Sequence, residues 1–115
     1  MDLEKFDILK RNYEKFIQEA EKAINQESAK QQTRSVWFDR QTIEKLLAQT
    51  DPKQGGIKIY LGMYDERTVS ERDDAERASD YIGKLTVVLT ASNVNQDPGQ
   101  ETMIVNGGKV CPPDC

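Results

Sequence analysis

The stretch IKIYLGMY, residues 57–64, is the clearest β-strand in this chain because it alternates between apolar and mixed positions. This period of two is that of a β-strand with one buried face. Residues 84–91 alternate in the same way, and residues 103–105 form a further short apolar run. The three stretches predict a small, mostly antiparallel sheet with helices covering one face. The side of the first stretch that we expect to be buried consists of Ile57, Ile59, Leu61 and Met63.

Two helices are expected beside these strands. Residues 2 to about 32 predict one long amphipathic helix, because apolar side chains recur at steps of three and four without Gly or Pro. A shorter helix follows the short strand 35–38, with Asp39 as its N-cap and an end near Gln49. We expect the stripe of the long helix to pack on the sheet, and the alternative is a helix that dimerises or binds a partner. The stripe consists of Leu3, Phe6, Leu9, Tyr13, Phe16, Ile17, Ala20 and Ile24.

The chain of 115 residues has the length of one domain. We assign residues 1–108 to a single α+β domain with a sheet of three to four strands, and residues 109–115 to a Cys-Pro-Pro-Asp-Cys tail. The net charge of −4 arises within residues 65–80, which hold seven acidic residues and three arginines. This acidic segment is expected to be a solvated surface, as either a short helix or a loop.

The composition excludes several classes of function. The chain has no histidine, so it cannot use a Ser-His-Asp triad or an H-E-x-x-H zinc site. Paired catalytic carboxylates, calcium loops and phosphate-binding glycine motifs are also missing from the sequence. We therefore expect a non-enzymatic protein without catalytic residues or a cofactor.

The charge pattern and hydropathy also limit the partners and the location. No basic stripe is present that could neutralise phosphates, so we expect no nucleic-acid partner. No run of 18 apolar residues occurs, and the N-terminus lacks the apolar core of a signal peptide. These features predict a cytoplasmic protein that does not enter a membrane and whose cysteines are mostly reduced.

Three aromatic side chains are candidates for a binding surface. Trp37, Tyr60 and Tyr64 lie on the predicted strands, and such side chains combine an apolar body with a polar tip. The alternative interpretation is an aromatic lid over an otherwise exposed sheet face. We expect a binding or protein-interaction module that acts as a homodimer or with a protein partner, with any small-molecule ligand left open.

The terminal cysteines are the second candidate site. Cys111 and Cys115 are four residues apart, and in an extended polyproline conformation this spacing covers about 12 Å. A disulfide needs Cα atoms about 4.4–6.8 Å apart, so a bond requires a tight turn through Pro113 and Asp114. The pair could be an inert tail, a redox pair or half of a metal site shared between chains. Thiol-redox or metal-linked chemistry is therefore the alternative function.

Three segments of the chain resemble a group of small, uncharacterised bacterial α+β proteins. These are the Val36-Trp37-Phe38 segment, the Ile-x-Ile-Tyr-x-Gly-x-Tyr strand at residues 57–64 and the Cys-Pro-Pro-x-Cys tail. The chain differs from the group in having Lys58 and Leu61 in place of Arg and Phe, and its acidic segment resembles an insertion. The resemblance implies a cytoplasmic α+β domain of bacterial type and brings no established activity with it.

Overall fold

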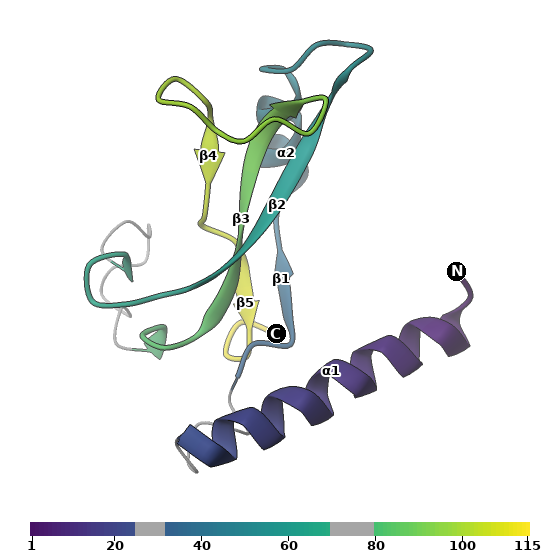
Figure 1. Cartoon of the computed structure of the whole chain (residues 1–115), viewed down its shortest axis with the longest axis vertical. Coiled ribbons are helices and arrows are strands. Elements are labelled where there is room, and N and C mark those ends of the chain that lie inside the picture. The colour runs from purple at the N-terminus through teal and green to yellow at the C-terminus, as the bar shows by residue number, and fades with distance from the viewer. Residues whose placement is uncertain (25–31, 70–79) are drawn as a thin grey trace.

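A computed structural model describes residues 1–24, 32–69 and 80–115 of the chain (Figure 1). Within these ranges the chain forms a long and a short helix and antiparallel strands, which confirms the predicted α+β class. The elements are α1 (Leu3–Ile24), β1 (Ser35–Trp37), α2 (Arg40–Leu47), β2 (Gly55–Met63), β3 (Leu85–Asn93), β4 (Ile104–Val105) and β5 (Lys109–Cys111).

The strands form two sheets instead of the single sheet expected from the sequence. One has the order β2-β3-β4, and the other is the pair β1-β5. The alternating stretches at 57–64 and 84–91 are confirmed as the central hairpin, β2 with β3. Their register runs without interruption from Gly55 opposite Asn93 to Met63 opposite Leu85.

The start of the C-terminal segment belongs to the fold. Residues 109–115 were expected to be a tail, but the first three of them form β5, in which Val110 lies opposite Val36 of β1. Val110 is fully buried. Only the residues after Cys111 therefore extend beyond the described sheets.

Side-chain caps mark the beginning of both described helices. The backbone N–H of Lys5 donates to Asp2 Oδ1 at 2.9 Å at the start of α1. The N–H of Thr42 donates to Asp39 Oδ1 at 2.9 Å, which confirms Asp39 as the N-cap of α2. Each carboxylate satisfies an amide that has no partner within its own helix.

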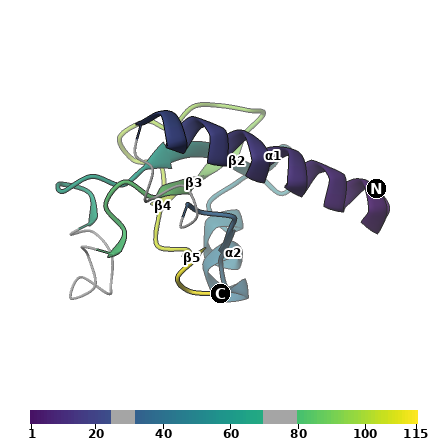
Figure 2. The same ribbon diagram turned by 90° about the horizontal axis from the view of Figure 1, so that it is seen from below.

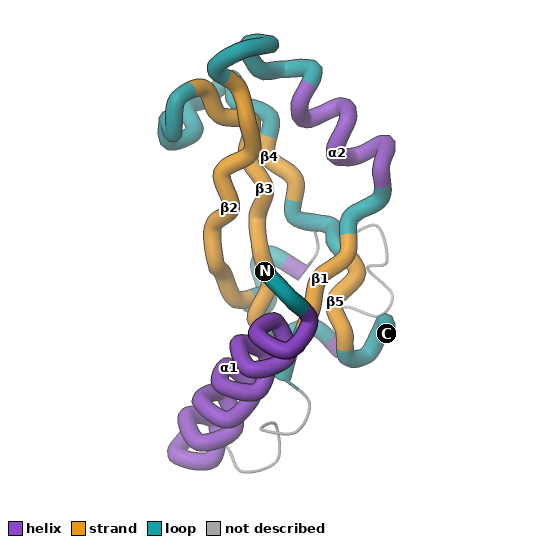
Figure 3. Tube along the Cα trace, turned by 90° about the vertical axis from the view of Figure 1, so that its right-hand side faces the viewer, coloured by secondary structure: helices purple, strands orange, loops and turns teal. Residues whose placement is uncertain are grey.

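The two helices have different relations to the sheet. α2 packs against β2 and β3, and its Leu46 is fully buried. Seen from below, α1 and α2 lie on opposite sides of the three-stranded sheet, so they do not cover one common face (Figure 2). α1 extends away from the strands (Figure 3), and the radius of gyration of 15.7 Å exceeds the value of about 13 Å for a compact domain of this length.

Polar contacts hold α1 near the strands. The Tyr13 hydroxyl donates to the carbonyl of Thr33 at 2.9 Å, and Gln32 Nε2 donates to Glu21 Oε1 at 3.1 Å. The amide oxygen of the buried Gln32 also accepts from the N–H of Leu85 at 2.7 Å. These bonds join the second half of α1 to the start of β3 while leaving most of its apolar stripe outside the core.

The core lies where the segment that connects β2 to β3 meets the β1–β5 pair. Tyr64, Val69, Tyr81 and Val110 form one buried cluster, and Val36 packs against it. The rings of Tyr64 and Tyr81 meet edge to face with centroids 6.3 Å apart. This small core therefore depends on residues that flank the strands as much as on residues within them.

Two sequence predictions fall outside the described residues. The expected extension of the long helix covers residues 25–31, beyond the observed end of α1 at Ile24. The choice between helix and loop for the acidic segment concerns residues 70–79, which include the neighbouring carboxylates Asp73 and Asp74.

Candidate interaction surface

Trp37 lies beside a groove at the junction of the two sheets. The indole is 58% exposed, and Lys109 Nζ lies 5.4 Å from its ring centroid. This distance permits a cation–π contact between opposite positions of β1 and β5. The groove has a volume of about 390 Å³ and combines an aromatic wall with charged and hydroxyl groups. Its lining consists of Trp37, Phe38, Asp39, Thr42, Ile104, Val105, Asn106, Gly107 and Lys109.

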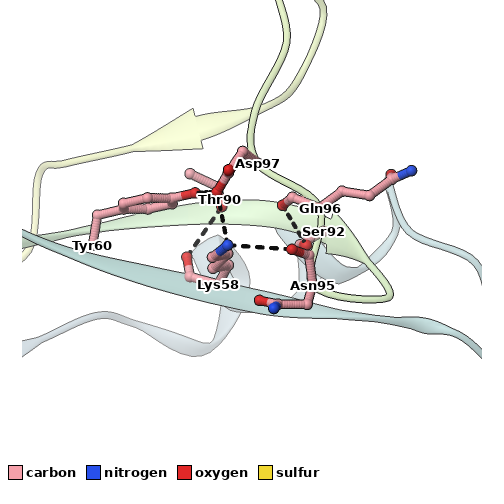
Figure 4. A network of polar contacts seen from close by, with 7 residues as sticks. All are labelled: Lys58, Tyr60, Thr90, Ser92, Asn95, Gln96 and Asp97. Atoms are coloured by element: carbon pink, nitrogen blue, oxygen red, sulfur yellow. Dashed lines mark hydrogen bonds and ion pairs between the residues drawn. The ribbon is translucent and has the colours of Figure 1, made fainter.

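Tyr60 belongs to a polar network on the sheet surface. Its hydroxyl donates to Asp97, and Lys58 Nζ forms an ion pair with the same carboxylate at 2.7 Å (Figure 4). Lys58 Nζ also donates to the carbonyl of Asn95 at 3.2 Å. The network therefore holds the loop after β3 against β2, and the Tyr60 hydroxyl is already engaged within its own chain.

The network changes the proton affinities of its members in consistent directions. The hydrogen bond with Asp97 raises the pKa of Tyr60, and the same carboxylate raises the pKa of Lys58. Hydrogen bonds from Lys58 and Tyr60 lower the pKa of Asp97. Each shift favours the charge state in which Lys58 is cationic, Asp97 is anionic and Tyr60 keeps its proton.

The prediction that Tyr64 lies on the same exposed face as Tyr60 is wrong. β2 ends at Met63, and Tyr64 is only 3% exposed within the core. Its hydroxyl donates to the carbonyl of Asn106 at 2.5 Å. The strand, and with it the alternation of its side chains, ends one residue before Tyr64. Trp37, Tyr60 and Tyr64 therefore do not form one aromatic surface.

The apolar side of β2 is exposed, contrary to the expectation that helices cover it. Ile59 is 60% exposed, Leu61 88% and Met63 56%. Leu89 of β3, which lies opposite Ile59, is buried, so the β3 part of this face is covered while the β2 part is exposed. We call the side chains of Ile59, Leu61 and Met63 the β2 apolar row.

The stripe of α1 is the second large apolar surface. Its helical period is confirmed, but most of its large side chains are exposed instead of forming core. Contiguous exposed apolar surface of this kind is typical of interaction sites in folded proteins. The exposed members are Leu3, Phe6, Leu9, Tyr13 and Phe16.

The terminal cysteines are bonded to each other. Cys111 and Cys115 form a disulfide across a Cα–Cα distance of 4.6 Å. The turn that this closure requires is held by the N–H of Asp114, which donates to the carbonyl of Val110 at 2.8 Å. The Asp114 carboxylate also accepts a hydrogen bond from the buried Tyr81. The tail is therefore attached to the core at two points.

Comparison with known proteins finds no relative. No protein family matches the chain, and no similar protein is found among the curated proteins or the solved structures. Within the described ranges, no three Cys, Asp or Glu side chains gather into a group that could hold a metal ion. In the same ranges, no helix has the length and apolar character needed to cross a membrane.

Proposed function

We propose that the protein is a non-enzymatic interaction module that binds a second copy of itself or another protein. The observation that carries this proposal is the exposure of apolar side chains that a solitary domain would normally bury, on α1 and in the β2 apolar row. The exposed Trp37 beside its groove supports it, because tryptophan is enriched in the energetically important parts of interfaces.

Substitutions on α1 test the proposal with a matched control. Phe16 lies within the exposed stripe, whereas Ile8 is an exposed apolar residue of the same helix outside this stripe, about 80° around the axis from Phe16. Phe16→Glu is expected to reduce binding at α1, measured as the partners retained by immobilised protein, while the mass in sedimentation equilibrium reports self-association separately. Ile8→Glu should leave both unchanged. A wild-type monomer that retains the same proteins as Phe16→Glu would contradict the proposal.

A second candidate function is thiol redox chemistry at the terminal cysteines. It is favoured over a metal site because the two sulfur atoms are bonded to each other, and a metal would need them as thiolates. A dithiol reductant would transfer two electrons and two protons to the bond and leave two thiols. Intact mass with and without reductant tests this, and a pair that resists reduction by excess dithiol in the folded protein would contradict it.

We also propose that the protein is cytoplasmic and of the small bacterial type that its sequence resembles. A reducing compartment would keep Cys111 and Cys115 as thiols. Alkylation of cell extracts at the moment of lysis should therefore label both residues. Full resistance to labelling would place the protein in an oxidising compartment instead.

A further inference from the structure

β2 presents a free edge. Outside the strand, Val94 N–H donates to the carbonyl of Gln54 at 3.0 Å, and Tyr64 N–H donates to the carbonyl of Lys84 at 3.0 Å. Hydrogen bonds alternate along an antiparallel strand, so even-numbered residues between these points face β3. The odd-numbered residues 57–63 therefore direct their N–H and C=O groups away from the sheet. No other described strand pairs with this side of β2.

The usual protection of an edge strand is weak here. Natural edge strands are commonly short, bulged or interrupted by proline or charged residues. β2 has nine residues, no proline and an unbroken register. Its one charged side chain, Lys58, is neutralised by Asp97 at 2.7 Å. The same odd positions that offer backbone groups also carry the β2 apolar row, in which Leu61 is 88% exposed.

The pattern of residues in β2 is nearly symmetric about its centre, with glycines at 56 and 62 and aliphatic residues at 57 and 61. Residues 56–62 read Gly-Ile-Lys-Ile-Tyr-Leu-Gly, which is close to a palindrome centred on Ile59. Ile59 is also the midpoint of the strand Gly55–Met63. Two copies related by a twofold axis at Ile59 pair along the whole strand, because a twofold axis makes an interface self-complementary.

We infer that β2 is the self-association edge of this protein, and that a second copy adds its own β2 in antiparallel orientation about an axis at Ile59. The inference rests on the proposed function and names the partner of the β2 surface. Ile57 lies opposite Leu61 of the second copy, and Ile59 lies opposite itself. Each of these pairs exchanges two backbone hydrogen bonds, which joins the two three-stranded sheets into one.

Charge complementarity favours this register. Lys58 lies opposite Tyr60 of the second copy, and Tyr60 holds the Asp97 carboxylate of its own chain. The ammonium group of each copy therefore lies across from the carboxylate side of the other copy. An axis at Lys58 would place two ammonium groups directly opposite each other, which destabilises a sheet. An axis at Tyr60 would leave part of the strand unpaired, and it would place Ile59 of one copy opposite Leu61 of the other.

Cysteine crosslinking of the full chain tests the register. In Ile59→Cys the two new cysteines lie opposite each other across the axis. Their Cα atoms are about 5.5 Å apart, which is within reach of a disulfide. In the matched control Leu61→Cys the two new thiols are about 14 Å apart along the strands. We expect dimers of Ile59→Cys to form about tenfold faster or more under mild oxidant, although Leu61 is the more exposed residue. Peptide mapping distinguishes this bond from exchange with Cys111 or Cys115.

Crosslinking results also identify the wrong registers. Equal or faster crosslinking of Leu61→Cys overturns the inference. Preferred crosslinking between Ile59→Cys and Leu61→Cys in a mixture indicates an axis at Tyr60 and also overturns it. Bonds between Ile57→Cys and Leu61→Cys in a mixture support the axis at Ile59.

A charge exchange at Ile59 provides an independent test in solution. Ile59→Lys and Ile59→Glu place like charges on the axis, so each variant alone should dissociate with a Kd raised about tenfold or more. An equimolar mixture should recover the dimer in sedimentation equilibrium. Because Ile59 is exposed, circular dichroism should show both variants folded. A wild-type protein that is monomeric at all concentrations overturns the inference. A dimer that Phe16→Glu abolishes and Ile59→Lys does not abolish also overturns it, but this second result leaves the proposed function standing.

Discussion

Tyr60 and Asp97 show how a single side-chain contact attaches a loop to a strand. The Tyr60 hydroxyl donates to Asp97, which is also paired with Lys58. Deprotonation of Tyr60 would remove this bond and place a phenolate beside a carboxylate. The pKa of Tyr60 is therefore raised above its ordinary value of about 10.

The pH dependence of this network has a defined sign on each side. The raised pKa of Tyr60 means that its contribution to stability is present below about pH 10 and is lost as the pH rises through the folded-state pKa. The lowered pKa of Asp97 means that its contribution is present above about pH 4 and is lost as the pH falls through the folded-state pKa. Asp97→Asn should move the Tyr60 ring titration, followed by NMR, back towards its ordinary pKa. Asp65→Asn, at a distant turn, is the control, and a Tyr60 pKa unchanged by Asp97→Asn would refute the contact.

At Gly108 the lack of a side chain allows close packing against Val36 and Phe38. A Cβ atom at this residue would lie 2.4 Å from Val36 Cγ1 and 2.7 Å from Phe38 Cζ. Gly108→Ala should therefore lower the free energy of unfolding by about 1–3 kcal/mol, as overpacking does. Gly107 has open space around it, so Gly107→Ala should change this energy by less than about 0.5 kcal/mol. Urea unfolding compares the two, and equal effects would mean that the backbone at Gly108 does not approach Val36 and Phe38 this closely.

Among the elements, α1 has an amphipathic sequence, but the large side chains of its apolar stripe are exposed. We expect Phe16→Glu to change the free energy of unfolding of the monomer by less than about 0.5 kcal/mol, because the ring is exposed. Leu46→Ala on α2 should lower it by about 2–5 kcal/mol, because Leu46 is fully buried. Chemical unfolding at low protein concentration measures both. A cost of several kcal/mol for Phe16→Glu would show that α1 packs on the sheet after all.

The terminal element is stabilised by a covalent bond across a short loop. The bond between Cys111 and Cys115 closes five residues, for which loop-closure entropy gives about 2 kcal/mol. Cys115→Ser should lower the free energy of unfolding by this amount. A dithiol reductant should lower the wild type to the same value and leave Cys115→Ser unchanged. A reduced wild type, verified by mass, that keeps its full stability would show that the bond does not hold the tail to the core.

At the scale of the whole molecule, local patterns predicted the elements better than their packing. The strand predicted from residue 57 onward and the cap at Asp39 are local properties, and both are confirmed, the strand as far as Met63. β5 was missed because three residues carry almost no periodic signal and pair with β1, which lies far away in the sequence. The burial of Tyr64 depends on the same long-range contacts, since Val110 of β5 belongs to its cluster.

The candidate site was predictable only in part for a related reason. An amphipathic pattern shows which side of an element is apolar, but it does not show what covers that side. The stripe of α1 and the β2 apolar row were therefore expected in the core, although they form the exposed surface. The near-palindrome around Ile59 was present in the sequence, and its meaning depends on knowing that β2 is an edge strand.

Hydrogen exchange along β2 would report directly whether a second copy pairs with its free edge. In the free chain the even-numbered amides Lys58 and Tyr60 bond towards β3, while those of Ile59 and Leu61 face outwards. Residue-resolved exchange is measured at low and at high protein concentration. We expect the amides of Ile59 and Leu61 to become protected as the concentration rises, with those of Lys58 and Tyr60 unchanged. Fast exchange of Ile59 and Leu61 at every concentration would contradict self-association through this edge.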